Sequence, residues 1–380
     1  MKANQLKDLI IFRDASRYAS FPSVDKHPEG GVILTFRDAV NRMPVLLERS
    51  KMACPRLHAD PTARHSAMRS ADGLNWGDPE VLYEEAENIG LNDPVITSLS
   101  DGAMLFGFFM YRFHPLDSVN ERSPLPVQWA AQKAKINDAH TIFNWALEMM
   151  SLRFLRSEDG GRTWEGPFTT QTREEIGGTL AHRGRLAELS DGRVFVVPYG
   201  PFGDPDLSAQ AHPVVLESSD GGRTWAKVGD IANPGDGVRV GETGLYAASD
   251  GRLIAFMRSQ RSGFLFTSES ADAGRTWSPP RRHEIFGHPF HPLPLDDGRI
   301  FLAYGHRREP FGIRARILRE DDLSPVDGGE IVLREDGGNQ DLGYPWSVRL
   351  DDRRVLTVYY FNTADDPVRR IEGTVTELMG

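Results

Sequence analysis

Glutamate, arginine and tyrosine stand at places in this chain where they could do chemistry together. Glu242 and Arg258 occupy the two ends of a stretch that holds an Asp-Gly turn between two apolar runs. The two ends of a hairpin lie side by side, so this spacing predicts that the carboxylate and the guanidinium reach the same edge of the fold. Tyr344 precedes a proline at the start of another apolar run. Arginine binds carboxylates in a bidentate manner, and tyrosine and carboxylates can act as acid, base or nucleophile.

A repeated motif identifies the elements that must position these residues. The pattern Ser-x-Asp-x-Gly-x-Thr-Trp predicts a folded hairpin, because Asp and hydroxyl side chains bond backbone N–H groups, Gly accepts a positive φ and Trp packs against apolar neighbours. Copies occur at residues 157–164, 218–225 and 270–277, in a form one residue shorter at 70–76, and in a degenerate form at 319–321. Each copy is expected to join the third and fourth strands of a four-stranded unit.

A second repeat gives the number of units. Turns of the Asp/Gly type, each followed by an apolar run, begin at Gly30, Asp101, Asp191, Asp250, Asp297 and Asp351. Each predicts a tight connection between an inner strand and its neighbour. Six units of four antiparallel strands indicate an all-β fold, a six-bladed β-propeller that takes residues 1–380 as a single domain.

Two segments lie outside this period. The apolar residues 9–12 are predicted to pair with the strand around residues 371–378 and to close the ring. Residues 115–148 interrupt the repeat, and their mixture of charged and apolar side chains predicts an inserted loop with some helix.

The strand directions predict where a site would lie. If both kinds of turn occupy one rim of the propeller, the starts of the inner strands and the ends of the second strands occupy the other. The starts hold Asp93, Arg183, Arg185, Glu242, His288 and Tyr344, and the ends hold Arg37, Arg112, His114, Tyr199, Arg258, His306, Arg307 and Tyr360. Such a ring of arginine, histidine, tyrosine and carboxylates suits an anionic or polyhydroxylated sugar.

The composition excludes several classes of function. A formal net charge of −10 argues against nucleic acid or an anionic membrane surface as the main partner. The single cysteine, Cys54, excludes an intrachain disulfide framework. The basic start of the chain is not followed by a long apolar segment, so no signal peptide is visible and a cytoplasmic protein is expected, with a secreted protein as the alternative if further residues precede this start. The sequence does not indicate an oligomeric state.

With these repeats the chain resembles the sialidase (neuraminidase) superfamily, whose members are six-bladed propellers with Asp boxes. The resemblance covers essentially the whole chain and implies a retaining glycoside hydrolase. It implies that Tyr344 is the nucleophile and that Glu242 removes its proton, because a neutral phenol with a pKa near ~10 is a poor nucleophile. It implies that Asp60 is the acid, and that Arg258 with either Arg307 or Arg314 binds the substrate anion.

One position departs from the family pattern. The family opens its first blade with Phe/Tyr-Arg-Ile-Pro, whose Arg clamps the sialic acid carboxylate, but here Ser20 occupies that place in Tyr18 to Pro22. Arg17 and Arg37 are the arginines that could substitute for it. Since a lost bidentate contact weakens carboxylate binding, the departure favours another acidic or deoxy sugar as the substrate.

The sequence thus predicts an exo-acting glycoside hydrolase on acidic or related terminal sugars, and leaves two alternatives. One is a polysaccharide lyase that cleaves at a uronate by β-elimination, and the other is a non-catalytic glycan-binding propeller. The predicted substrate-binding residues are Arg37, Asp93, Arg258, His288, His306, Arg307 and Arg314. No cofactor is expected. No metal is expected either, because the histidines around His288 have neither cysteine partners nor an HExxH-like spacing.

Overall fold

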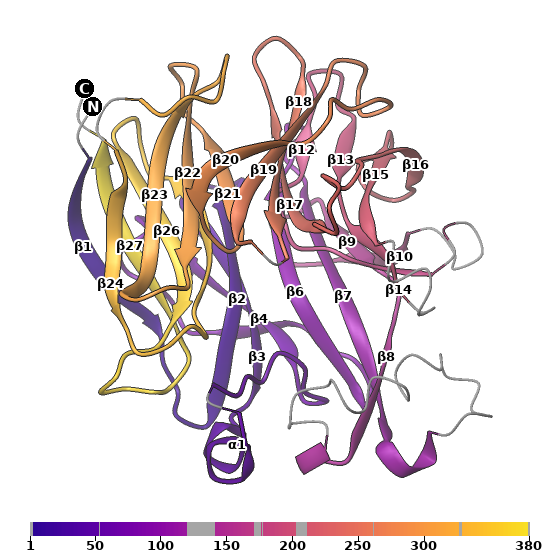
Figure 1. The fold of residues 1–380 in the computed structure, drawn as a ribbon, viewed down its shortest axis with the longest axis vertical. Coiled ribbons are helices and arrows are strands. Elements are labelled where there is room, and N and C mark those ends of the chain that lie inside the picture. Colours follow the sequence, from indigo (N-terminus) through magenta and orange to yellow (C-terminus); the bar gives the residue numbers. More distant parts are fainter. Residues whose placement is uncertain are drawn as a thin grey trace.

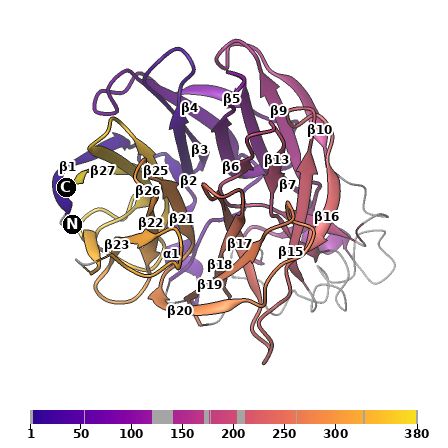
Figure 2. The ribbon, with the colours of Figure 1, turned by 90° about the horizontal axis from the view of Figure 1, so that it is seen from above.

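Antiparallel β-sheets make up nearly all the regular structure of this protein (Figure 1). The structure is a computed structural model that describes residues 3–52, 54–119, 141–170, 176, 178–202, 211–260, 262–326 and 329–378. Six sheets stand around a central axis, and in Figure 2 the strands β2, β6, β17, β21 and β25 lie nearest to it. The predicted six-bladed propeller with four-stranded antiparallel blades is confirmed.

The blades follow one another along the chain. Blade 1 consists of β2 (Arg17–Lys26), β3 (Val32–Val40), β4 (Arg64–Ser70) and β5 (Glu80–Tyr83), from the axis outward. Blade 2 consists of β6 (Ile89–Ser98), β7 (Met104–Pro115), β9 (Arg153–Ser157) and β10 (Glu165–Thr169). Blade 4 consists of β17 (Val240–Ala247), β18 (Leu253–Ser259), β19 (Phe264–Ser270) and β20 (Arg281–Phe286), and blade 5 of β21 (Phe290–Pro294), β22 (Arg299–His306), β23 (Phe311–Arg319) and β24 (Ile331–Gly337).

Blade 3 has divided inner strands. Its inner strand is split into β11 (Thr179–Ala181) and β12 (Ala187–Glu188), and its second strand is split into β13 (Val194–Val196) and β14 (Tyr199–Phe202). The third and fourth strands are β15 (His212–Ser218) and β16 (Ala226–Asp230). The interruption of the inner strand contains Arg183 and Gly184. A Cβ atom on Gly184 would lie 1.8 Å from the carbonyl oxygen of Thr243 in blade 4, so the close approach of the two blades requires glycine here.

Blade 6 closes the ring. Its strands β25 (Gly343–Arg349), β26 (Arg354–Phe361) and β27 (Arg370–Leu378) are completed by the N-terminal strand β1 (Ala3–Phe12). Leu9 lies opposite Gly373 and Phe12 opposite Ile371, so the predicted pairing of residues 9–12 with residues 371–378 is confirmed. The first and last described residues, Ala3 and Leu378, consequently lie side by side (Figures 1 and 2).

Both kinds of predicted turn occupy their expected places. All six Asp/Gly turns connect an inner strand to a second strand, and all five boxes connect a third strand to a fourth. In the box of blade 3, Oδ1 of Asp220 accepts the N–H groups of Arg223 and Thr224 at 3.0 and 2.9 Å. Trp225 then stacks on Phe154 of blade 2 with ring centroids 4.4 Å apart, so the box fastens one blade to the next.

Two excursions extend beyond the blades at the rim away from these turns. The helix α1 (Met43–Arg49) follows β3, and strand β8 (Trp145–Met149) pairs with the end of β7; both lie at the lower end of the molecule in Figure 1. The described ends of the predicted 115–148 insertion therefore contain a β-hairpin, one 3₁₀ turn, η1 (Leu116–Ser118), and two helical residues, 141–142. The rest of that prediction, at residues 120–140, lies outside the described residues.

Candidate active site

Four inner strands carry the same irregularity near their first residues. Phe21, Asp93, Glu242 and Tyr344 have φ values of 54°, 44°, 45° and 50°, and in each blade the pairing with the second strand skips two residues there. A bulge of this kind re-aims a side chain, and a positive φ at a residue other than glycine costs on the order of 1–3 kcal/mol. Four of the nine non-glycine residues with a positive φ in the described part of the chain thus share one end of the central channel.

Two of these residues and one arginine form the centre of the site. The Tyr344 hydroxyl donates to Oε1 of Glu242 at 2.5 Å. Nη1 of Arg258 donates to Oε2 of Glu242, forming an ion pair, and to the Tyr344 oxygen at 3.2 Å. Tyr344 and Glu242 are 5% and 6% exposed. The structure therefore brings together the phenol, carboxylate and guanidinium whose meeting the sequence predicted.

The electrostatics of this trio keep the phenol neutral and the carboxylate charged. Burial raises the pKa of Tyr344, and the charge of Glu242 raises it further. Burial alone would raise the pKa of Glu242, but the Arg258 guanidinium and the Tyr344 hydrogen bond outweigh it and lower that pKa. An ionised carboxylate at hydrogen-bond distance from a neutral phenol is the arrangement of a base beside a nucleophile.

A second arginine reaches the phenol ring from blade 5. The Arg307 guanidinium lies 5.2 Å from the centroid of Tyr344 and donates to the Tyr360 hydroxyl at 3.1 Å. Nε and Nη2 of Arg307 also bond the carbonyl of Leu342 at 3.0 and 2.9 Å. Arg314, the other candidate, lies in β23, where it bonds carbonyls of its own blade and pairs with Glu330 at 3.6 Å. Of the two arginines that the sequence left open, Arg307 is the one beside Tyr344.

Arg183 lies beneath these residues, in the interrupted inner strand of blade 3. Its side chain is 1% exposed and donates to four carbonyl oxygens, of Pro22 at 2.7 Å, Pro94 at 3.1 Å, and Phe21 and Tyr344 at 3.3 Å. Its guanidinium also faces the rings of Tyr344 and Trp346, with centroids at 5.3 and 5.1 Å. One buried cation thus ties the bulges of blades 1, 2 and 6 together.

Arg37 fills the region where Ser20 departs from the family pattern. The two residues face each other across β2 and β3, and Nη1 of Arg37 donates to Oγ of Ser20 at 3.5 Å and to the Leu57 carbonyl at 3.1 Å. The side chain is fully buried, and its Nε and Nη2 atoms have no hydrogen-bond partner among the described residues. Arg17, the other possible substitute, is paired with Asp38 at 2.5 Å.

Asp93 is a buried carboxyl in the bulge of blade 2. It is 5% exposed, and its Oδ1 atom lacks a hydrogen-bond partner in the part of the chain that the structure describes. Burial raises the pKa of Asp93 to about 7, the charge of Arg183 opposes this rise and the charge of Glu242 adds to it. Near neutral pH the Asp93 carboxyl is therefore present both as the ionised form, which accepts hydrogen bonds, and as the protonated form, whose hydroxyl can donate one.

The raised pKa of Asp93 can be tested by measuring how the thermal stability of Asp93→Asn depends on pH. A carboxyl whose pKa is raised by folding stabilises the protein at acid pH, and this contribution is lost as the pH rises toward the folded value of about 7. We therefore expect the Tm of Asp93→Asn relative to wild type to increase between about pH 5 and about pH 8. Asp191→Asn is the control, because a hydrogen bond from Arg193 lowers the pKa of Asp191; this carboxyl therefore stays ionised in both the folded and the unfolded state between these pH values, and its Tm difference should not change with pH. An equal Tm difference at both pH values would contradict the assignment.

The other predicted residues take different places. Asp60 is fully buried; its carboxylate accepts Nε of Arg42 at 2.8 Å and the backbone N–H and hydroxyl of Thr62 at 2.8 and 2.6 Å. Its assignment as the acid stays a prediction. His288 is partly buried near the trio; burial first, then the charges of Arg258 and Arg307, lower its pKa to about 3, so it is neutral.

His306 lies farther out on the rim, with Nδ1 3.1 Å from the carbonyl of Pro310 and its ring 5.7 Å from that of Phe286. In the described ranges no three His, Cys, Asp or Glu side chains converge as metal ligands. No helix in those ranges has the length and apolar character of a membrane span.

Sequence reasoning missed Asp341, and it recognised Arg183 only as a rim residue. Asp341 follows Asn339 in a turn-like stretch before β25, yet its carboxylate is fully buried. Nothing in the local sequence distinguishes it from a solvated turn residue, because its partners are distant in the sequence: Tyr18 and His58 come from blade 1, and Tyr360 and Arg369 from later in blade 6. For Arg183, the sequence indicated only that it lies at the start of an inner strand.

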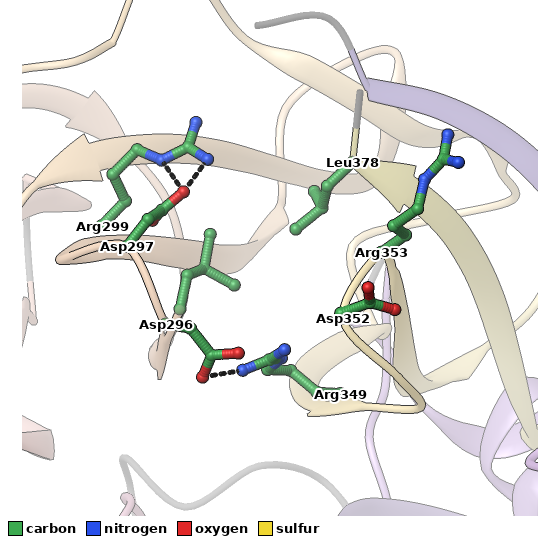
Figure 3. A pocket seen from close by; sticks show the side chains of 8 residues that line it. Asp296, Asp297, Arg299, Arg349, Asp352, Arg353 and Leu378 are labelled. Carbon is green, nitrogen blue, oxygen red and sulfur yellow. Dashed lines mark hydrogen bonds and ion pairs between the residues drawn. The ribbon is translucent and has the colours of Figure 1, made fainter. Parts of the chain in front are cut away.

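A cavity of about 430 Å³ lies on the opposite rim, between the Asp/Gly turns of blades 5 and 6 (Figure 3). Its lining includes Asp296, which forms an ion pair with Arg349, and Asp297, which forms one with Arg299 (Figure 3). These charges neutralise one another within the lining, in contrast to the cation-rich end that holds Tyr344. The residues with the geometry for a reaction therefore lie at the rim that carries the four bulges.

Comparison with known proteins agrees with this architecture. Residues 139–358 match the model of the BNR repeat-like domain. The chain therefore belongs to the BNR repeat-like family, and its six blades with recurrent boxes are the sialidase-superfamily propeller that the sequence resembles. The search of curated proteins found no match.

Solved structures share this fold at differing identity. A protein of unknown function from Dyadobacter fermentans DSM 18053 is 30% identical, with a TM-score of 0.83 over 99% of both chains. The Hadza microbial sialidase Hz136 is 17% identical, with a TM-score of 0.63 over 95% of this chain and 66% of its own. The intramolecular trans-sialidase from Ruminococcus gnavus is 15% identical, with a TM-score of 0.64 over 96% of both chains. These two sialidases are similar to this chain in fold.

Proposed function

We propose that this protein is a retaining, exo-acting glycoside hydrolase of the sialidase type that acts on a terminal acidic sugar. The observation that carries the proposal is the contact of the Tyr344 hydroxyl with Glu242 at 2.5 Å, with Arg258 bonded to both. A phenol is a better nucleophile than a carboxylate toward an anionic sugar, because its charge develops only as its proton leaves. The sialidases among the structural neighbours support the same class of substrate.

The reaction begins at the anomeric carbon. As the Tyr344 oxygen forms its bond to this carbon, the phenolic proton passes to Glu242, and the bond to the leaving group breaks with protonation of the departing oxygen. Water then attacks the same carbon and gives one proton to the group that protonated the departing oxygen, while the bond to Tyr344 breaks and the phenol recovers its proton from Glu242. Two displacements at one carbon give overall retention of configuration.

The positive charges around the phenol favour an anionic substrate. Arg258 and Arg307 both lie within reach of Tyr344, and Arg183 adds a third charge beneath its ring. Arg37 lies opposite Ser20 and both are fully buried, so the region that holds an arginine in the family pattern here contains a serine hydroxyl with a cation beside it. This difference supports an acidic sugar whose polar groups differ from those of common sialic acids.

A substrate panel tests the proposal with the wild-type protein. We expect release of 4-methylumbelliferone from α-ketosides of N-acetylneuraminic acid or of a deoxy analogue, with the product first appearing in the anomeric form of the substrate when followed by NMR. Inversion of configuration would contradict the tyrosyl mechanism. No release from any acidic aryl glycoside would contradict the hydrolase.

A second candidate, β-elimination at a uronate, is favoured by one observation. His288 remains neutral beside Arg258 and Arg307, as is required of a base that removes the proton next to a carboxylate held by arginine. Cleavage by this route creates a double bond that absorbs in the near ultraviolet, so the absorbance of a polyuronate digest separates the two candidates. Saturable glycan binding without either product would indicate a binding propeller.

A further inference from the structure

A histidine with an oriented imidazole stands at the site, on the loop between β3 and β4. The His58 ring contacts Phe21 edge-on with centroids 5.0 Å apart, and Phe21 contacts Tyr344 in the same manner at 4.8 Å. The imidazole and the phenol are therefore separated by one phenyl ring. The side chain of His58 is 27% exposed, so it is accessible from the rim.

The orientation of His58 is set by a buried carboxylate. Oδ1 of Asp341 lies 2.9 Å from Nε2 of His58 and accepts the Tyr360 hydroxyl at 3.1 Å. Oδ2 accepts the Tyr18 hydroxyl at 2.7 Å and Nε of Arg369 at 2.9 Å. Asp341 is fully buried and cannot turn away, and its hold on Nε2 leaves Nδ1 as the nitrogen for proton exchange.

Asp60, two residues further on the same loop, is arranged differently. Its carboxylate is occupied by Arg42 and Thr62, and Arg42 packs between Asp60 and the rings of Phe143 and Trp145 at 5.5 Å. A leaving-group oxygen could reach this carboxylate only if the loop opened. Asp60 has the contacts of a loop anchor, whereas His58 has those of an exposed acid or base.

We propose that His58, positioned by Asp341, exchanges the proton with the leaving group in the reaction described above. This inference depends on the proposed glycosidase function and assigns its acid and base. In the first step protonated His58 gives its proton to the departing oxygen while that oxygen separates from the anomeric carbon. In the second step His58 takes a proton from the attacking water, whose oxygen bonds to the same carbon as the bond to Tyr344 breaks.

The groups around His58 define its pH dependence. Burial lowers the pKa of His58, the hydrogen bond and charge of Asp341 oppose this, and the charges of Arg56 and Arg307 lower it further. Tyr360 faces it with a hydroxyl whose pKa burial raises, so that group stays neutral. Since the first step needs the protonated imidazole, kcat/KM on a poor leaving group should fall as the pH rises through this lowered pKa.

The test is the leaving-group dependence of His58→Gln. The probes are methyl, phenyl and 4-methylumbelliferyl α-ketosides of N-acetylneuraminic acid, or of whichever acidic sugar the wild type hydrolyses. On the methyl and phenyl ketosides we expect the kcat/KM of His58→Gln to be about 10²–10⁴-fold lower than that of the wild type. It should also lack the decrease of kcat/KM with rising pH that is expected of the wild type. The umbelliferyl substrate, whose departure needs little acid assistance, should give a burst of about one fluorophore per enzyme followed by slow turnover, because the second step lacks its base.

His212→Gln is the matched control. His212 also pairs with a carboxylate, Asp230 at 3.0 Å, and is 31% exposed, but it lies on β15, an outer strand of blade 3. It should retain the wild-type dependence on leaving group. If His58→Gln does not fold, Asp341→Asn serves instead and is expected to shift the pH profile and weaken activity on the poor leaving groups.

The inference is overturned if wild type and His58→Gln show the same leaving-group dependence, or if Asp60→Asn alone gives the burst and the loss on poor leaving groups. Absence of turnover by the wild type on every probe would instead refute the proposed function. The two failures are therefore distinguishable.

Discussion

Tyr344→Phe is expected to lower kcat on an aryl ketoside by at least about 10³-fold, the scale of loss when a covalent nucleophile is removed. The change deletes the oxygen that bonds Glu242 at 2.5 Å and leaves the ring that packs against Phe21. Glu242 keeps its ion pair with Arg258, so no buried charge is left without a partner. The variant should fold normally and bind substrate, which is checked by its thermal unfolding and by competition binding.

The matched control for this variant is Tyr246→Phe. Tyr246 lies on β17, the strand that carries Glu242, and its hydroxyl also donates to a carboxylate, that of Glu320. This second phenol–carboxylate pair lies toward the opposite rim, so its loss should leave kcat unchanged. Equal activity of Tyr344→Phe and wild type would remove the tyrosine from the mechanism and leave His288 as the base to examine.

Arg183→Met is expected to lower the free energy of unfolding by about 3–5 kcal/mol. Methionine fills much of the same volume but leaves the carbonyls of Phe21, Pro22, Pro94 and Tyr344 without their donor in a buried channel. Buried acceptors without partners each cost about 1–3 kcal/mol, partly offset because the guanidinium itself no longer has to be desolvated. The measurement is urea unfolding monitored by tryptophan fluorescence.

Arg193→Met, on the same blade, is the control for this loss. Arg193 pairs with the exposed Asp191 and with Glu217 at 3.2 Å near the surface, where ion pairs contribute at most about 1 kcal/mol. Arg183→Lys should fall between Met and wild type, since an ammonium can satisfy some of the carbonyls. A change under about 1 kcal/mol for Arg183→Met would show that the bulges of blades 1, 2 and 6 keep their conformation without this cation.

The fold could be predicted from the sequence because its signals are local and repeated. A box such as residues 218–225 forms its own turn through Asp220 and places Trp225 on the adjacent blade. Such short-range hydrogen bonds do not depend on distant parts of the chain. The division of the inner strand around Arg183 was not predictable in this way, since it depends on carbonyls contributed by three other blades.

The candidate site could be predicted in part for the same reason. Glu242 and Arg258 are joined by one hairpin, so their meeting followed from spacing. The choice between Arg307 and Arg314 needed the path of the chain after β22, because only the residue beyond the strand end turns toward Tyr344. Asp341 could not be assigned, because its role comes from a histidine that lies 283 positions away in the chain.

The positive φ values could not be foreseen either. Phe21, Asp93 and Tyr344 each precede a proline, and a residue in that position normally adopts an extended conformation. The ring of neighbouring blades, with Arg183 at its centre, holds them in a conformation that the local sequence disfavours. These strained residues coincide with the site, where local propensity and global fold disagree.

The pairing of β1 with β27 has a consequence for the order of events during synthesis. Blade 6 needs both the first and the last strand of the described chain, so it cannot be completed until Arg370–Leu378 has left the ribosome. Blade 6 also carries Tyr344, whereas Glu242 and Arg258 belong to a blade that can form earlier. Long-range pairing of this kind is slow to form. If Tyr344 is the nucleophile, as proposed above, a nascent chain would hold its base and its anion site assembled well before the nucleophile is in place, and would gain activity only when the ring closes.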